Sequence, residues 1–478
     1  MLLVVSGESF WIDEAGTAYY ARVANIGQWW HGISTSGMTE VQVPLYTIFV
    51  WAFAKCFGVG EFPLRMAGAL WLIPGLTAFV VSFSGDGRRL AALLVASTNA
   101  FVWYYANEAR TYAMVLGGSF LVFAALNRLA SRQVSSETEN RWLCGFAFGL
   151  LVVCGSSMLG MIWASMALGA AWVLFPAERL MAWWRKQRFL WALLAVILAG
   201  LGCYYIWTVR LGARGSDAGT TDWRTTVFIL YDQLGFEGLG PGRTALRAEG
   251  VRALWPFAPG LLCYGATLAV IFFFALKEAW RLFPRKLAAL AVAILVPWAF
   301  LSLVGIVTHF RLLGRHSAPL TPIWLLLIAN GAVVLAARPG WAGRMIVMAF
   351  LSLSLFSSLS VRFAYRQSKD DYRRAAALAA AALAERRSVW WNADDMAAKY
   401  YHLPVSDSAA APETALHIVN PSDATVEGLK QPQMIVVSRP DLYDNSGALA
   451  RYMARHGYHA TTAFPAFEIW TAPTPSQR

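Results

Sequence analysis

The sequence predicts a mainly α membrane protein, a polytopic helix bundle that carries a small C-terminal α/β domain. Of the 478 residues, 57% are hydrophobic and 14% are charged, and the mean hydropathy is +0.47. An ordinary soluble domain contains about 25% charged residues, so too few polar side chains remain to cover a soluble globule. In addition, the apolar residues gather in runs of span length, and the last of these runs stops at Val361. These observations together exclude an ordinary soluble enzyme.

A helix crosses the hydrocarbon core of a bilayer with about 20 apolar residues, and this length predicts about 10–11 spans. We expect the first of them to be truncated. The others are predicted at Pro63–Ser84, Leu90–Ala106, Tyr112–Ala130, Trp142–Ser156, Met158–Pro176, Phe189–Val209, Leu254–Ala275, Leu287–Thr308, Ser317–Ala336 and Met345–Val361.

The connections between these spans predict the orientation of the protein. If the spans alternate, the connectors rich in Lys and Arg, such as Gly85–Arg89 and Lys277–Lys286, all fall on one side. Basic loops mark the cytoplasmic side of a membrane. We therefore expect a bacterial inner-membrane protein whose outer loop 8–62, long loop Arg210–Ala253 and C-terminal part face the periplasm.

Two segments near the N-terminus need separate explanations. Leu45–Phe57 is apolar but short, contains Lys55 and follows Pro44, so we interpret it as an interfacial helix on the outer face. Met1–Val5 is far too short to cross, although an inbound helix is required there, and it lacks the features of a signal peptide. We expect that the true start lies upstream and that most of a first helix is missing.

The composition changes after Val361, which predicts two domains: 1–361 in the membrane and 362–478 outside it. Short apolar runs between turn-forming residues alternate with helical patterns, which is typical of a small α/β domain with a partly parallel sheet. The expected helices are Asp370–Arg387 and Leu442–His456, and the expected strands are Val389–Trp391, Leu416–Val419 and Met434–Ser438.

Charge and cysteine usage exclude other classes of protein. The net charge of +12 lies in short clusters between apolar runs, whereas a nucleic-acid-binding protein would gather it on one soluble face. The five cysteines lie in or beside apolar segments and form no CxxC pattern. Neither a disulfide framework nor a zinc site is indicated.

The first candidate for chemistry is the pair of adjacent carboxylates Asp13 and Glu14, at the expected outer surface of the membrane. Such a pair suits a general base or a metal ligand. Equally, Asp and Glu are favourable in the first turn of any helix, where they meet the positive end of its dipole. From the residues alone, both interpretations stay open.

Two further clusters fall at the outer ends of spans. In the first, Glu108, Arg110 and Tyr112 lie at a membrane boundary, where Glu108 and Arg110 either pair with each other or hold a phosphate among aromatic rings. The second contains Arg311, Arg315 and His316, on the side that should be poor in positive charge. Arginine is well suited to bind phosphate, although it also binds lipid head groups generally.

The order of several motifs resembles a known family. Phe10-Trp-Ile-Asp13-Glu14-Ala, Pro44-Leu-Tyr46, Gly60-Glu-Phe-Pro-Leu-Arg65 and Asn107-Glu-Ala-Arg-Thr-Tyr112 follow one another as in the GT-C membrane glycosyltransferases. The chain is most similar to the bacterial branch that contains protein O-mannosyltransferases and aminoarabinose transferases. The resemblance covers the first third well and the hydropathy of the middle. It departs from the family at His316, where a Tyr is common.

This resemblance implies an inverting glycosyltransferase that moves a sugar from a polyprenyl-phosphate donor to a polysaccharide, lipid or protein acceptor. It assigns the reaction centre to Asp13 and, less directly, Glu14. It assigns the donor phosphate to Arg311 and Arg315, with His316 beside them and Arg110 as a further contact, supported by Glu108 and Tyr112. No cofactor is firmly implied. A divalent cation is compatible with the family, and its weak candidate ligands here are Glu40 and His31.

Two other functions remain open from the sequence. A transporter or flippase of lipid-linked sugars would have ionisable residues near the middle of the membrane, whereas here they gather at the outer ends of the spans. A non-catalytic sensor of envelope polysaccharide would leave the Asp13 and Arg311 clusters without a role. The sequence therefore favours chemistry at the outer surface, with a lone aspartate opposite guanidinium groups.

Overall fold

The computed structural model describes residues 3–35, 39–131, 135–211, 221–282, 284–406 and 415–473. The chain divides into two compact units. The first consists of Met1–Val5, Asn25–Phe57 and Pro63–Gln367, and the second of Ser6–Ala24, Gly58–Phe62 and Ser368–Arg478. The segment before residue 25 therefore groups largely with the C-terminal residues, whereas the sequence boundaries placed it with the membrane domain.

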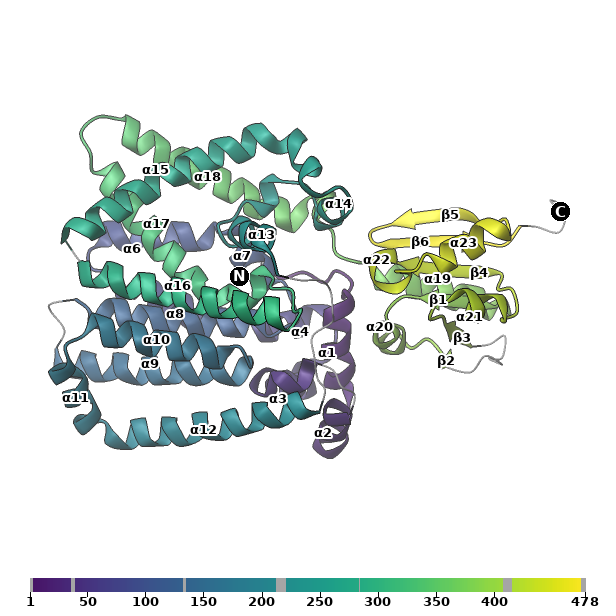
Figure 1. Cartoon of the computed structure of the whole chain (residues 1–478), viewed down its shortest axis with the longest axis horizontal. Coiled ribbons are helices and arrows are strands. Elements are labelled where there is room, and N and C mark those ends of the chain that lie inside the picture. Colours follow the sequence, from purple (N-terminus) through teal and green to yellow (C-terminus); the bar gives the residue numbers. More distant parts are fainter. Residues whose placement is uncertain are drawn as a thin grey trace. The chain divides into compact units, whose positions relative to one another are not determined.

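The first unit is helical (Figure 1), and seven helical stretches in the described part of the chain are long and apolar enough to cross a membrane. They are α4 (Glu61–Ala69) with α5 (Leu72–Ser82), α8 (Tyr112–Leu129), α12 (Arg188–Arg210), α14 (Arg243–Glu249) with η3 (Gly250–Phe257) and α15 (Ala258–Leu282), α16 (Pro284–Val307), η4 (Gly314–Leu320) with α17 (Thr321–Ala336), and α18 (Ala342–Phe363).

Shorter or less apolar helices complete this unit. They are α2 (Ile26–Thr35), η1 (Thr39–Gln42), α3 (Pro44–Phe57), α6 (Asp86–Ser97), α7 (Ala100–Ala106), α9 (Ser136–Ser156), α10 (Gly160–Leu174), α11 (Ala177–Lys186), α13 (Trp223–Gln233), η2 (Glu237–Leu239) and η5 (Tyr365–Gln367).

The predicted membrane protein is confirmed, and three of the predicted spans differ in detail. The span expected at Leu90–Ala106 is divided into α6 and α7, because the Asn99 side chain accepts a hydrogen bond from the Val102 amide and starts a new helix. The span expected at Met158–Pro176 is the 15-residue helix α10. The span expected at Trp142–Ser156 lies within α9, whose first turn carries Glu137 and Glu139.

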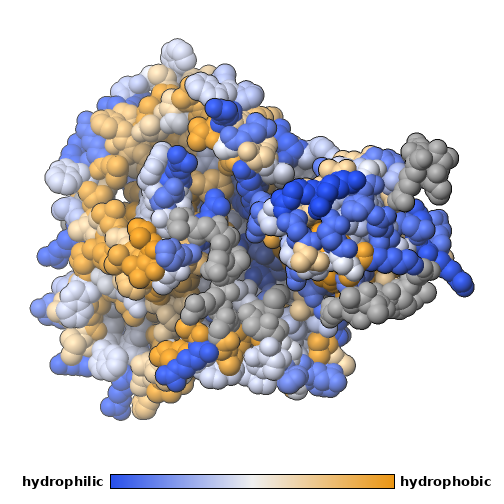
Figure 2. Space-filling view, turned by 45° about the vertical axis from the view of Figure 1, so that its right-hand side comes forward, coloured by the Kyte–Doolittle hydropathy of each residue, from blue (hydrophilic) through white to orange (hydrophobic). Residues whose placement is uncertain are grey.

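The spans differ in how much of their surface faces other helices. In α8 and in the η4–α17 stretch, 72% of the most apolar window is buried, whereas in α12 only 11% is buried. Large hydrophobic side chains on α12, α15 and α16 are exposed, among them Phe189, Leu262 and Leu295. Figure 2 shows such side chains spread over the surface of the first unit. A bilayer would cover them, so the chain is a multi-pass membrane protein.

The second unit contains one six-stranded sheet in the order β2-β3-β1-β4-β6-β5. β1 (Val389–Asn392), β2 (Val405–Ser406), β3 (Leu416–Ile418) and β4 (Met434–Ser438) pair in parallel, whereas β5 (His459–Phe464) and β6 (Phe467–Thr471) form an antiparallel hairpin whose β6 pairs with β4. The helices are α1 (Ile12–Arg22), α19 (Tyr372–Ala384), α20 (Asp395–Tyr400), α21 (Asp423–Glu427), α22 (Pro440–Tyr443) and α23 (Ala448–Arg455).

The predicted α/β domain with a partly parallel sheet is confirmed, with two corrections. The single helix expected at Leu442–His456 is wrong, because Gly447 adopts a left-handed φ of 69° and the Asp444 carboxylate accepts hydrogen bonds from the amides of Leu449 and Ala450. The β5–β6 hairpin was not predicted. Its first strand shows little hydrophobic alternation, since most of its residues are exposed.

The packing of α8 on the α4–α5 stretch depends on glycine. A Cβ at Gly117 would lie 2.1 Å from the Trp71 carbonyl oxygen, and one at Gly75 would lie 2.3 Å from the Gly117 carbonyl oxygen. Backbone atoms occupy these places, so neither can move without a shift of a whole helix. The two helices therefore approach each other at a contact that only glycine permits.

We expect Gly117→Ala to destabilise the protein by about 1–3 kcal/mol, because the added methyl group overpacks this contact. Gly200→Ala in α12 is the matched control, since a Cβ there meets no atom within 4 Å. Thermal unfolding of both variants in detergent measures the difference. Equal unfolding temperatures would show that the Gly117 contact carries no such constraint.

Candidate functional site

A row of tyrosine rings lies where α7 ends and α8 begins in the first unit. The ring centroids of Tyr104 and Tyr105 are 5.0 Å apart, and those of Tyr105 and Tyr112 are 5.2 Å apart. The rings meet edge to face, which is a favourable geometry for aromatic pairs. Three arginines approach this tyrosine row or the turn within it.

Arg110 lies in the turn between Tyr105 and Tyr112 and forms a buried ion pair with Glu40. Its Nη1 is 2.5 Å from Glu40 Oε1, and the two side chains are only 10% and 2% exposed. Arg110 therefore pairs with a residue of η1, a partner that the sequence did not indicate. Glu108 is also buried.

Arg315 and His316, on η4, have different environments. The Arg315 guanidinium lies 5.6 Å from the centroid of the Tyr112 ring, so it joins the tyrosine row. His316 Nδ1 accepts a hydrogen bond from the Leu313 amide, and its carbonyl accepts one from Trp163 Nε1. His316 thus holds the turn that carries Arg315. Arg311 is exposed.

The segment from Thr221 to Arg243 holds this turn from another side, and the sequence did not reveal its role. Thr221 Oγ1 donates to the Phe310 carbonyl and accepts from the Leu312 amide. Gln233, at the end of α13, donates to Ser317 Oγ at 2.9 Å and accepts from Trp324 Nε1 at 2.8 Å. α13 therefore fastens η4 and α17.

The same segment supplies a third arginine to the tyrosine row. The Arg243 guanidinium lies 3.8 Å from the Tyr104 ring centroid. Glu237 binds Arg243 through both carboxylate oxygens, and Asp232 Oδ1 lies 3.4 Å from Arg243 Nη2. The only signal in the sequence was the presence of these charges in a long loop between spans.

Burial raises the pKa of the Asp232 carboxyl well above its ordinary value, because the charged form loses its hydration. The neighbouring Glu237 raises it further and Glu108 adds a smaller effect, whereas Arg243 opposes them. Two carboxylates share one guanidinium here, so the carboxyl of Asp232 retains its proton more readily than an exposed aspartate.

Asp13 and Glu14 belong to the second unit, in the first turn of α1. Glu14 Oε2 accepts a hydrogen bond from the Trp11 amide at 3.3 Å, and its Oε1 lies 3.7 Å from Lys369 Nζ. Glu14 therefore completes the start of the helix, as an acidic first turn is expected to do. Asp13 is half-buried and does not share this capping contact. Its proximity to the arginines of the first unit stays a prediction.

The two weak candidate ligands for a cation have different environments. His31 is exposed on α2, whereas Glu40 is buried on η1 and pairs with Arg110. Within the described part of the chain, no group of three or more His, Cys, Asp or Glu side chains is arranged to hold a metal ion.

The buried Glu40–Arg110 pair leads to a test of stability. We expect Glu40→Ala and Arg110→Ala each to lower the free energy of unfolding by about 3–5 kcal/mol, since each removes one member of a buried ion pair. The double variant should lose less than the sum of the two, because the shared ion pair is lost only once. Unfolding of the three variants measures the coupling, and additive losses would contradict a direct pair.

Comparisons with known proteins bear on the fold. No family profile matches the chain, and no curated protein matches it. Among solved structures, ArnT from Cupriavidus metallidurans in the apo state is similar over 98% of this chain and 96% of that chain, with 14% identity and a TM-score of 0.52. The same protein bound to undecaprenyl phosphate is similar over 99% and 96%, with 13% identity and a TM-score of 0.49. The chain thus shares the fold of ArnT, an aminoarabinose transferase of the GT-C class, and the predicted resemblance to this family is confirmed for the fold.

Proposed function

We propose that this chain is an inverting GT-C glycosyltransferase that moves a sugar from a polyprenyl-phosphate donor to a polysaccharide, lipid or protein acceptor. One observation carries the proposal: Arg243 and Arg315 lie against rings of the tyrosine row, and Arg110 belongs to the turn between Tyr105 and Tyr112, in a membrane unit that has the ArnT fold. Such a cluster suits a phosphorylated lipid.

The arginines supply what the leaving group needs. When the bond between sugar and phosphate breaks, the lipid phosphate becomes a monoester and gains a second negative charge. Fixed guanidinium groups stabilise that charge as it develops, so no general acid is required. We assign the donor phosphate to Arg110 and to the turn that contains Arg311, Arg315 and His316. We add Arg243, which the sequence did not indicate.

Asp13 is the residue that we assign to the acceptor. A sugar or lipid hydroxyl has a pKa far above 7, and a carboxylate that takes its proton accelerates transfer by about 10²–10⁴-fold. Glu14 is engaged by the Trp11 amide and lies near Lys369, which favours Asp13 as the base. Direct displacement then inverts the anomeric centre.

Apolar side chains surround the turn that follows Arg311, among them Trp163, Trp298, Leu301 and Leu313. The hollow between them is far too small for a polyprenyl chain, so the lipid part of the donor is proposed from the fold and not from this hollow. ArnT has been crystallised with undecaprenyl phosphate, and we extend this class of lipid to the present chain as part of the proposal. The basic connectors on the opposite side support a periplasmic position for the reaction, in the inner membrane.

The direct test uses purified protein reconstituted with a polyprenyl-phosphate sugar and an acceptor extract. We expect acceptor-dependent release of polyprenyl phosphate and a product of inverted anomeric configuration, detected by mass spectrometry and NMR. Movement of intact lipid-linked sugar across the vesicle membrane without cleavage would instead identify a transporter and refute the proposal.

We expect Asp13→Asn to abolish transfer while the protein still binds the donor lipid, because only the proton acceptor is lost. Asp441→Asn is the control, since Asp441 is an exposed acidic residue in the first turn of another helix of the same unit. Turnover and donor binding are measured for both. Wild-type turnover in Asp13→Asn would reject this residue as the base.

Removal of an arginine should act on the donor. We expect Arg311→Ala or Arg315→Ala to weaken donor binding by about 10–100-fold, since a hydrogen bond to a charged group contributes about 1.5–3 kcal/mol. Arg141→Ala is the control, because Arg141 forms an exposed pair with Glu137 within one helix. If donor affinity stays unchanged in both site variants, the phosphate lies elsewhere.

A further inference from the structure

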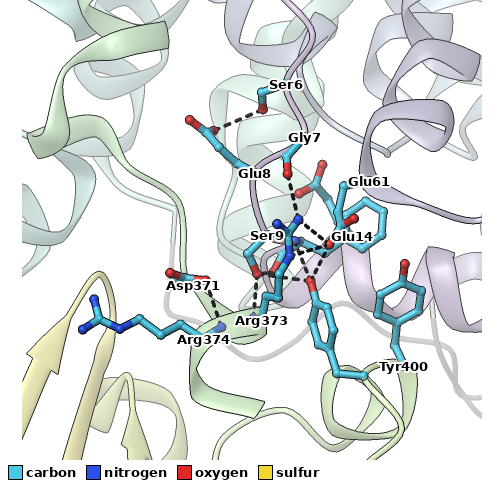
Figure 3. Close-up of polar contacts among 12 residues, drawn as sticks. Ser6, Gly7, Glu8, Ser9, Glu14, Glu61, Asp371, Arg373, Arg374 and Tyr400 are labelled. Carbon is cyan, nitrogen blue, oxygen red and sulfur yellow. Dashed lines mark hydrogen bonds and ion pairs between the residues drawn. The ribbon is translucent and has the colours of Figure 1, made fainter. Parts of the chain in front are cut away.

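Within the second unit, the helix that carries Asp13 is fastened at both ends by the α/β domain. α1 packs against α20, although these helices are separated by most of the chain. The contacts gather at the extended segment before α1 and at its last turn. Figure 3 shows the first group, in which Arg373 contacts Gly7, Ser9 and Glu61.

Tyr401 is the centre of the first group. Its hydroxyl accepts a hydrogen bond from the Phe10 amide at 3.1 Å and lies 3.2 Å from Ser9 Oγ. The same hydroxyl donates to Glu61 Oε1 at 3.1 Å. Burial raises the pKa of Tyr401 to about 12, so the hydroxyl keeps its proton for Glu61 at physiological pH.

Arg373, at the start of α19, contacts the same segment. Its guanidinium donates to the Gly7 carbonyl at 2.7 Å and forms an ion pair with Glu61 at 2.6 Å. Its backbone amide donates to Ser9 Oγ at 2.9 Å. Side chains of the α/β domain therefore bind the backbone of the segment that leads into α1.

The last turn of α1 is held as well. Arg22 Nη1 donates to the Tyr400 carbonyl at 2.8 Å, and its Nη2 lies 3.2 Å from His402 Nδ1. The rings of Phe10 and Tyr400 meet edge to face, with centroids 5.2 Å apart. Since α1 has contacts of this kind at both ends, its position along and around its axis is determined by the α/β domain.

We propose that the C-terminal α/β domain positions the catalytic base Asp13, and that Tyr401 and Arg373 are its positioning residues. This inference rests on the proposed function, because it takes Asp13 as the base. Neither residue needs to touch the substrate. Catalysis is sensitive to such positions, since a misplacement of about 1 Å can lower a rate by about a hundredfold.

The test compares Tyr401→Phe with Tyr458→Phe. Both changes remove one hydroxyl from the same unit, but the Tyr458 hydroxyl donates to the Pro432 carbonyl, away from α1. We expect Tyr401→Phe to lower kcat for sugar transfer by about tenfold or more, with an unchanged KM for the polyprenyl-phosphate sugar. Amide hydrogen exchange in residues 9–15 should also become faster. Tyr458→Phe should change neither quantity.

Arg373→Lys provides a second variant if Tyr401→Phe does not fold. Lysine keeps the charge but cannot reach Gly7 and Glu61 with one planar group, so the same fall in kcat and the same faster exchange are expected. Arg451→Lys is its control, because Arg451 pairs with Asp423 on the surface of the same unit.

The outcomes separate the two proposals. Equal kcat and equal exchange in Tyr401→Phe and Tyr458→Phe would overturn the positioning role, whatever the reaction is. If the wild-type protein transfers no sugar, the proposed function fails. In that case, faster exchange of residues 9–15 in Tyr401→Phe alone still supports the fastening of α1, and unchanged exchange refutes it.

Discussion

Arginine side chains at the end of a membrane helix bundle need partners, because a charge removed from water is costly unless an opposite charge or an aromatic ring stabilises it. This constraint organises the site of the first unit. Arg110 pairs with Glu40, Arg243 with Glu237 and Asp232, and Arg315 lies against Tyr112. The contacts of Arg110 and Arg315 join η1 and η4 to the short stretch that contains the tyrosine row, and Arg243 joins its own segment to that stretch through the Tyr104 ring.

The carboxylate partners of Arg110 and Arg243 affect how a phosphate could bind there. A phosphate must either displace the carboxylate from the guanidinium or bind the same guanidinium beside the carboxylate. The arrangement holds the guanidinium groups in place before the ligand arrives, which lowers the cost of ordering them. It also explains why buried acidic residues occur at a site that we assign to an anion.

The second unit has to orient a short helix whose buried apolar residues are mostly alanines. α1 buries Ala15, Ala18 and Ala21, and polar side chains fasten its ends in addition. Ser9 and Tyr401 are 392 positions apart in the chain, yet their hydroxyl groups are in contact. The α/β domain at the end of the chain can in this way influence a residue near its beginning.

The sequence by itself determined the membrane class, most helix positions and the parallel part of the C-terminal sheet, because apolar length and local periodicity depend only on neighbouring residues. It also singled out Glu108, Arg110 and Arg315, since charges beside spans are rare enough to be noticed, together with the neighbouring Tyr112. Only the tertiary structure showed that Arg110 pairs with Glu40 and that Arg243 joins the tyrosine row. Likewise, only the tertiary structure connected Tyr401 and Arg373 to the segment before α1. These pairings join segments far apart in the chain, and no local pattern specifies which buried charge or hydroxyl becomes the partner of another.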